Sequence, residues 1–172
     1  MLDLGIVIVN WNVRELLAAC LDSVYADLAG SGLRGKVVVV DNDSHDGSVE
    51  MLTRQFPRTQ VIGAPNRGMG AGNNLGLHAL GLGRGADSSQ APFAALVLNP
   101  DTLVRSGALR ILVDFLRQRP AAAVVAPQLL NADGSLQHTG FRFPGLTQAA
   151  FDLFPPPGRL ARLIESPLNG RY

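Results

Sequence analysis

Short apolar runs that stop abruptly at polar residues constrain the fold of this chain more than any other feature. Five such runs lie at residues 4–9, 36–40, 60–63, 93–98 and 121–126. A continuous apolar run of this length predicts a strand with both faces covered. Between the runs, apolar residues at helical spacing predict helices over residues 13–28, 48–56, 68–82 and 106–119. Strands that alternate with helices predict an α/β domain with a mostly parallel sheet and helices on both faces.

Polar residues directly follow three of the predicted strands. The three clusters are Asn10-Trp11-Asn12, Asp41-Asn42-Asp43 and Asn99-Pro100-Asp101. In parallel sheets of this kind, ligands bind outside the carboxyl ends of the strands. The sequence therefore predicts that three clusters, far apart along the chain, meet at one edge of the sheet and form a ligand site there.

The third cluster offers oxygen ligands for a divalent metal ion. The Asp101 carboxylate and the Asn99 amide are hard donors of the kind that bind magnesium or manganese, which also bind substrate phosphates. Pro100 restricts Asn99 to an extended backbone. The alternative is structural, with Asp101 capping the helix that begins near Ser106 or forming part of a turn.

The first two clusters are candidates for binding a nucleoside. Asp41 ends a buried strand and can accept hydrogen bonds from a base or a ribose, and Trp11 can stack on a base. The alternatives are that Asp41 belongs to a turn and that Trp11 is a core or rim aromatic. For Asp43, Asp46 and Ser48 we favour caps and turns before the following helix.

Residues 66–74, with the sequence Asn-Arg-Gly-Met-Gly-Ala-Gly-Asn-Asn, form a glycine-rich start to a predicted helix. Backbone N–H groups at a helix start bind anions, and Arg67 can pair with a diphosphate. The glycine spacing does not fit the dinucleotide fingerprint, and the chain has no P-loop sequence. The small residues of this helix predict close packing on its neighbours.

Composition narrows the class of protein further. With 172 residues, 47% hydrophobic and 17% charged, the chain fits one globular domain, and its net charge of +1 argues against a nucleic-acid partner. The lone cysteine, Cys20, lies in a helical pattern, where we expect a small buried side chain. No apolar run of about 18 residues and no cleavable leader is present, which predicts a cytoplasmic protein, at most peripheral at the inner face of the membrane.

Four strings taken together are far more specific than any one of them. The strings IVIVNWN, VVVVDNDSHDGS, NRGMGAGNNLGL and LVLNPDTLV occur in the order and rough spacing of family 2 glycosyltransferases. The chain resembles the rhamnosyltransferase-like branch, whose metal motif often reads Asn-Pro-Asp, and the resemblance weakens after Pro144. The resemblance implies a GT-A fold, which is Rossmann-like, and inverting transfer of a sugar from a nucleoside-diphosphate donor.

The resemblance also implies roles for particular residues. Those implied to line the nucleoside and diphosphate sites are Val9, Asn10, Trp11, Asp41, Asn66, Arg67 and Gly68. Those implied to flank a divalent ion, magnesium or manganese, are Asn99 and Asp101. The donor would be dTDP- or UDP-linked, with rhamnose as the sugar that the branch suggests. A glycan or lipid-linked acceptor would make the reaction a step of cell-surface polysaccharide synthesis.

The chain departs from the family pattern near its C-terminal end. The family's general base lies in a later acidic segment, and Glu165 has a different context, so we expect no catalytic base before Tyr172. Residues 1–143 are predicted to form a nucleotide-sugar-binding domain that is truncated relative to the family, and residues 144–172 a Pro-interrupted tail. Apolar surface left exposed in this way would favour a homodimer.

Two other functions remain open on the sequence. A non-catalytic α/β module for nucleotide-sugar binding or protein interaction would keep the fold without the general base. A nucleotidyltransferase would need a basic, glycine-rich loop after the first strand, and residues 10–14 do not form one.

Overall fold

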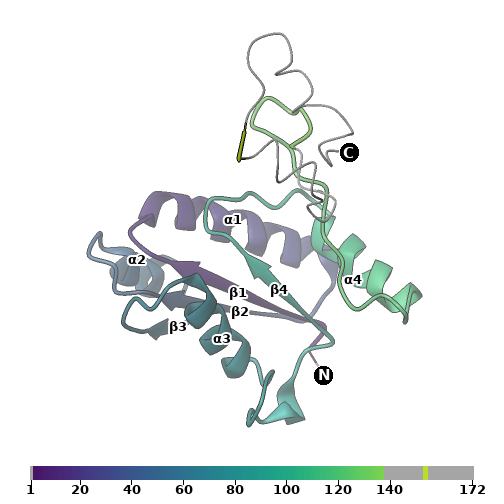
Figure 1. Ribbon diagram of the computed structural model, residues 1–172, viewed down its shortest axis with the longest axis horizontal. Helices are drawn as coiled ribbons and strands as arrows, with labels where there is room; N and C mark the ends of the chain where they lie inside the picture. Colours follow the sequence, from purple (N-terminus) through teal and green to yellow (C-terminus); the bar gives the residue numbers. More distant parts are fainter. Residues whose placement is uncertain (1, 138–152, 155–172) are drawn as a thin grey trace. The chain divides into compact units, whose positions relative to one another are not determined.

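A four-stranded parallel sheet forms the centre of the fold (Figure 1). The computed structural model describes residues 2–137 and 153–154. The strands are β1 (Leu4–Asn10), β2 (Gly35–Asp41), β3 (Gln60–Gly63) and β4 (Ala94–Leu98), in the spatial order β3-β2-β1-β4. Each neighbouring pair runs parallel. The predicted α/β class with a parallel sheet is confirmed.

Helices cover both faces of the sheet, as predicted. They are α1 (Arg14–Ser31), α2 (Ser48–Gln55), α3 (Met69–Ala79) and α4 (Ala108–Gln118), with a 3-10 turn η1 (Ser88–Gln90). In Figure 1, α1 and α4 lie on one side of the sheet and α3 on the other. The chain lays down β1, β2 and β3 in one direction and then returns past β1 to β4. Because crossovers are right-handed, this reversal moves α3 to the opposite face.

Successive side chains of the two central strands point into two separate cores. On the face covered by α1, α2 and α4, the buried strand residues are Leu4, Ile6, Ile8, Val37 and Val39. On the face covered by α3, they are Val7, Val38 and Val40. Burial on both faces explains why these strands have continuous apolar runs rather than alternating ones.

Two glycines let α3 lie close to the sheet. A Cβ atom added at Gly76 would collide with the side chain of Val7, and one added at Gly72 would lie 2.8 Å from Val9 Cγ1. Any larger residue at either position would push the helix away from β1. The prediction that this glycine-rich helix packs closely on its neighbours is confirmed.

The predicted fifth strand, at residues 121–126, is wrong. The structure has no strand there, and residues 122–125 line an apolar pocket beside β4. Three of the six residues predicted to form this strand are consecutive alanines, which are depleted in strands and bury little surface. The apolar character of this run was therefore not enough to specify a strand.

The first helix is longer than predicted. The sequence places a break at Gly30, yet α1 continues to Ser31 and ends at Gly32, which adopts φ +68°. A left-handed residue after the last turn is a common helix end, and glycine adopts it without strain. The helix therefore ends at Gly32 rather than at Gly30.

Residues 126–137 belong to a second compact unit. Leu130 and Leu136 form an antiparallel bridge, and the amide of Gly134 donates to the carbonyl of Asn131 between them. The turn predicted at residues 131–134 is confirmed, as is an extended Leu136. His138, Glu165 and, apart from residues 153–154, the predicted tail lie outside the described residues.

Candidate functional site

The predicted polar clusters follow strands that are neighbours in the sheet. Asn10 and Asp41 are register partners at the ends of β1 and β2, and Leu98, just before Asn99, pairs with Ile8. Neighbouring strands lie about 4.8 Å apart, so the backbones of Asp41 and Asn99 are separated by about 10 Å across β1. The three clusters therefore meet at one edge of the sheet, as predicted.

This edge coincides with the reversal in strand order. The chain moves outward from β1 to β3, then crosses to β4 on the other side of β1. Loops that leave adjacent strands in opposite directions open a crevice at their carboxyl ends, where α/β proteins bind ligands. Here that point lies between the ends of β1 and β4, beside Asn10 and Asn99.

Asn10 is fully buried and joins the first two clusters. Its Nδ2 donates to Ser44 Oγ at 3.0 Å, and the same oxygen accepts the amide of Asn12 at 3.0 Å. Its Oδ1 is buried without a hydrogen-bond partner among the described residues. Buried unsatisfied acceptors are rare because each costs roughly 1–3 kcal/mol. This atom is one acceptor at the strand end that the chain's own groups leave unused.

Asp41 is 1% exposed, and its own loop fixes its carboxylate. Both carboxylate oxygens accept the amide of Ser44, at 3.3 and 3.2 Å, while its carbonyl accepts the amide of Ala64 at 2.9 Å. The Asp41 side chain therefore takes part in the turn that follows β2, in agreement with the structural alternative. A single shared amide leaves the carboxylate with further acceptor capacity, so these contacts do not rule out a ligand.

Asp46 serves the start of α2 rather than a ligand. It accepts hydrogen bonds from the amide and hydroxyl of Ser48, at 3.0 and 2.6 Å, and from the amide of Arg14 at 2.8 Å. Burial alone would raise the pKa of this carboxyl, but the hydrogen bonds outweigh it and the pKa is lowered. The structural interpretation that we favoured for Asp46 and Ser48 agrees with these contacts. Asp43 is exposed, with φ +65°.

The glycine-rich segment presents an exposed start to α3. Asn66, Arg67 and Gly68 are all exposed, and the amide of Gly68 donates to Asn66 Oδ1 at 3.0 Å. The carbonyl of Gly68 lies 3.5 Å from Asn42 Nδ2, which ties this segment to the second cluster. Within residues 2–137, no carboxylate forms an ion pair with Arg67. A cation beside exposed helix N–H groups suits an anion.

Asn99 and Asp101 are both exposed after β4. The carbonyl of Asn99 accepts the hydroxyl of Thr102 at 2.7 Å and the thiol of Cys20 at 3.7 Å, so the backbone is held while both side chains face solvent. The Asp101 carboxylate makes no hydrogen bond within the described part of the chain. Asp101 lies in a turn, as one structural alternative predicted. The other alternative, that Asp101 caps α4, is wrong, because Asp27 accepts the amides at the start of that helix.

The donor set suits a magnesium or manganese ion that is shared with a ligand. No group of three or more His, Cys, Asp or Glu side chains that could hold a metal occurs among the described residues. The chain offers Asp101 and Asn99, one carboxylate and one amide oxygen. Magnesium keeps several waters and is bound through one or two carboxylates plus substrate phosphates. The residues present therefore fit such an ion, for which phosphate and water would supply the remaining ligands.

Trp11 and Val9 have different surroundings. Trp11 is 58% exposed, so the core alternative is wrong and its ring is available at the edge of the site. Val9 is partly buried and packs on the face covered by α3, where its side chain lies against Gly72. Val9 thus packs beneath the end of β1 and presents no polar group to a ligand.

Sequence reasoning missed the residues that hold the third cluster in place. Ser23 and Asp27 lie on α1, about 80 positions away in sequence, and accept amides from the segment after β4. Their spacing in α1 gave no indication of a partner, because polar residues on a helix surface usually face water. Only the placement of α1 beside α4 reveals the contact.

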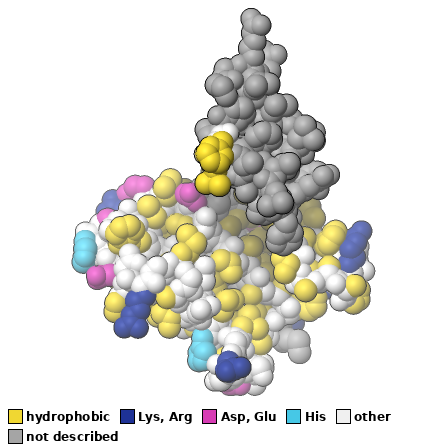
Figure 2. All heavy atoms as spheres, viewed as in Figure 1, with side chains coloured by type: hydrophobic (Ala, Val, Ile, Leu, Met, Phe, Trp, Pro, Cys, Tyr) yellow, Lys and Arg dark blue, Asp and Glu magenta, His cyan; other side chains and the backbone are white. Residues whose placement is uncertain are grey.

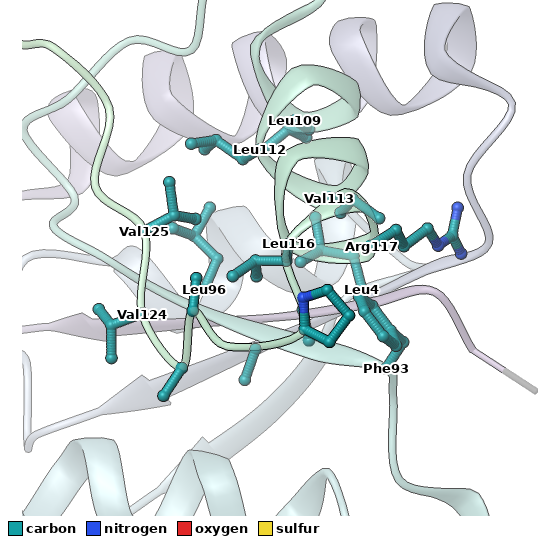
Figure 3. Close-up of a pocket in the computed structure, with 15 residues that line it drawn as sticks. Leu4, Phe93, Leu96, Leu109, Leu112, Val113, Leu116, Arg117, Val124 and Val125 are labelled. Atoms are coloured by element: carbon teal, nitrogen blue, oxygen red, sulfur yellow. The ribbon is translucent and has the colours of Figure 1, made fainter.

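An apolar pocket of about 630 Å³ lies elsewhere (Figure 3). It is formed by the beginning of β4, by α4, and by Pro120 and residues 122–125, with Leu96, Leu116 and Val125 among its walls. Arg117 is its one charged group. The pocket lies at the amino end of β4, opposite the polar clusters, and its one cation, Arg117, already pairs with Asp3. We therefore separate it from the candidate site.

The view in Figure 2 shows hydrophobic and uncharged side chains in the middle of one face and charged side chains towards its margins. Val97, in β4, is 48% exposed, and Phe93, next to β4, is 49% exposed.

None of the helices in the described ranges is long and apolar enough to cross a membrane.

Relatives with solved structures share this fold at low sequence identity. A mannosyltransferase from Pyrobaculum calidifontis, in complex with GDP-Man and Mn2+, aligns with a TM-score of 0.54 at 19% identity, over 76% of this chain and 38% of that one. S. aureus TarS 1-349 in complex with UDP-GlcNAc aligns with a TM-score of 0.55 at 15% identity, over 73% of this chain and 37% of that one. The architecture is that of the GT-A glycosyltransferases.

Sequence comparison points the same way. The N-acetylglucosaminyl-diphospho-decaprenol L-rhamnosyltransferase of Mycobacterium tuberculosis is 25% identical over 113 residues, which are 64% of this chain and 36% of the relative. The chain thus matches little more than a third of the length of that relative. The model of the family "Glycosyl transferase family 2" matches residues 5–146, which is most of the chain. The chain therefore belongs to glycosyl transferase family 2.

Proposed function

We propose that this chain binds a nucleoside-diphosphate-sugar at the carboxyl edge of its sheet. The full reaction is inverting transfer of the sugar to a glycan or lipid-linked acceptor, as a step of cell-surface polysaccharide synthesis. The protein works in the cytoplasm, at the inner face of the membrane where a lipid-linked acceptor is available. The name of the rhamnosyltransferase relative supports rhamnose as the sugar. The nucleotide of the proposed donor is dTDP or UDP.

The observation that carries the proposal is the meeting of three polar clusters at the strand reversal. Asn10 and Asp41 are buried neighbours with acceptor capacity to spare, which suits a base or ribose that donates hydrogen bonds. The exposed ring of Trp11 next to them suits stacking on the base. Asn99 and Asp101 follow on the far side of β1.

The diphosphate would lie between the glycine-rich segment and the third cluster. Arg67 and the amides near Gly68 would bind its negative charge, while Asn99 and Asp101 would hold a magnesium or manganese ion. When bound, the divalent ion supplies charge neutralisation on the diphosphate leaving group. The chain's own groups orient the donor and stabilise the same charge. We assign the general base for the acceptor to none of the described residues.

A homodimer is the proposed association. Exposed apolar side chains at β4, including Val97 and Phe93, support it, because such patches favour contact between copies.

Thermal unfolding with a panel of nucleotides tests the proposed function. A ligand selective for the folded state stabilises it by about 2.7 kcal/mol at one hundred times its Kd. For a chain of this size, that corresponds to a rise in Tm of about 5–10 °C. We expect such a rise with UDP or dTDP plus Mn²⁺, and a much smaller one with ADP plus Mn²⁺. Equal Tm values with and without every pyrimidine diphosphate would refute the proposal.

A further inference from the structure

Three side chains of α1 contact the segment that follows β4. They are Cys20, Ser23 and Asp27, whose spacing of three and four residues puts them on one face of the helix. That face lies against the stretch from Asn99 to Leu109, which carries the Asn99-Pro100-Asp101 cluster and the start of α4.

Asp27 caps α4 from another helix. It is 5% exposed, and its two carboxylate oxygens accept the amides of Gly107 and Leu109, the latter at 2.9 Å. Gly107 occupies the cap position of α4 and has no side chain to serve this purpose. Within the described residues, no Lys or Arg pairs with Asp27. The carboxylate is therefore satisfied by helix N–H groups and by the positive end of the helix dipole.

Ser23 and Cys20 hold the middle and the beginning of the same stretch. Ser23 Oγ accepts the amide of Val104 at 2.9 Å and donates to the carbonyl of Cys20 at 2.7 Å. The thiol of Cys20 lies 3.7 Å from the carbonyl of Asn99. The stretch from Asn99 to Gly107 has no regular secondary structure of its own, yet α1 holds it at its beginning, middle and end.

We propose that Asp27 and Ser23 are positioning residues for Asp101. The inference rests on the proposed function, in which Asp101 helps to hold a divalent ion on the donor diphosphate. Since the Asp101 carboxylate is exposed and makes no hydrogen bond among the described residues, its location depends on the backbone segment that carries it. Asp27 and Ser23 fix that segment, so they act on metal affinity through Asp101 without touching the ion. Groups that orient ligands in this way typically change metal affinity by 10–100-fold when removed.

The test compares Asp27→Asn and Ser23→Ala with Asp22→Ala, an exposed position on the same helix. Calorimetry gives the affinity for UDP and dTDP with and without Mn²⁺, below the unfolding range of every variant. We expect the Mn²⁺-dependent gain in affinity to fall by about tenfold in both test variants and to persist in the control. Affinity without Mn²⁺ should stay within about twofold.

Hydrogen exchange supplies a second readout that does not depend on metal. In Asp27→Asn, faster exchange should reach Asp101 to Val104, beyond the capped amides of Gly107 and Leu109. A lower Tm with the full Mn²⁺ gain, or faster exchange confined to residues 107–109, would reduce Asp27 to a helix cap and overturn the inference. Absence of any Mn²⁺ gain in the unaltered chain would instead refute the proposed metal site, and the positioning role with it.

Discussion

The thiol of Cys20 lies fully buried between α1 and the segment after β4. Burial, reinforced by the negative charge of Asp101, raises its pKa from 9.0 to about 11. The folded state therefore disfavours the thiolate. The resulting stabilisation is complete below pH 9, the pKa of the unfolded thiol, and is lost as the pH rises through about 11.

We accordingly expect the free energy of unfolding to fall by about 2 kcal/mol between pH 8.5 and 11 because of this one group. Urea unfolding at several pH values, in the unaltered chain and in Cys20→Ala, isolates the effect, since other groups titrate equally in both. Parallel pH profiles for the two proteins would contradict the account.

At the same scale, residue type predicted some environments and not others. Cys20 in an apolar helical pattern was predicted to be buried, and it is 0% exposed. From its place in the helical pattern, Asp27 would be an exposed polar residue. It is only 5% exposed, because its hydrogen-bond partners lie on a different helix. The apolar pattern along a helix predicts which of its residues are buried. It does not predict the burial of a carboxylate whose hydrogen-bond partners come from a distant segment.

The packing of α3 on β1 depends on a glycine, Gly76, at the point of closest approach. Gly76 faces Val7 with no room for a Cβ atom, whereas Gly70, in the same helix, has nothing within 4 Å of that position. We expect Gly76→Ala to lower the free energy of unfolding by about 1–3 kcal/mol through overpacking. Gly70→Ala should leave it unchanged or raise it by up to about 1 kcal/mol through helix propensity. Chemical denaturation of both variants checks this, and similar losses in the two would show that α3 does not approach β1 so closely.

Elements with strong patterns were predicted well. Four apolar runs became strands, and all four helices formed, because both signals come from residues close together along the chain. The run at residues 121–126 failed because a strand also needs a partner. Its short alanine side chains occupy the wall of a pocket instead of extending the sheet beyond β4. Strand pairing is a tertiary property that apolar composition alone does not determine.

For the molecule as a whole, the exposed apolar residues of β4 predict self-association. Val97→Glu should shift a dimer towards monomer in sedimentation at micromolar concentrations, because it places a charge in the contact. Val49→Glu, at a 41% exposed valine on α2, is the matched control. An identical distribution of species in the unaltered chain and both variants would exclude β4 as the contact.

The order of the strands in the sheet determines which polar clusters lie together in the candidate site. Three clusters spread over 90 positions were predicted to meet, because parallel strands end at a common edge, and the register confirms it. Hydrogen bonds inside the loops, such as the sharing of Ser44 by Asn10 and Asn12, were beyond prediction, since they depend on backbone conformations like φ +53° at Asn12. The sequence thus predicted that the three clusters lie at one edge of the sheet, and the structure shows which of their side chains already form hydrogen bonds within the chain.

Titration of UDP and dTDP into the unaltered chain and into Asp101→Ala, each with and without Mn²⁺, tests the central claim most directly. The account predicts that Mn²⁺ tightens binding to the unaltered chain by about tenfold or more, since Asp101 would help to hold an ion that neutralises charge on the diphosphate. It predicts that Asp101→Ala loses this gain and keeps its metal-free affinity. An equal Mn²⁺ gain in both proteins would contradict the assignment of Asp101 and of the donor site at this edge.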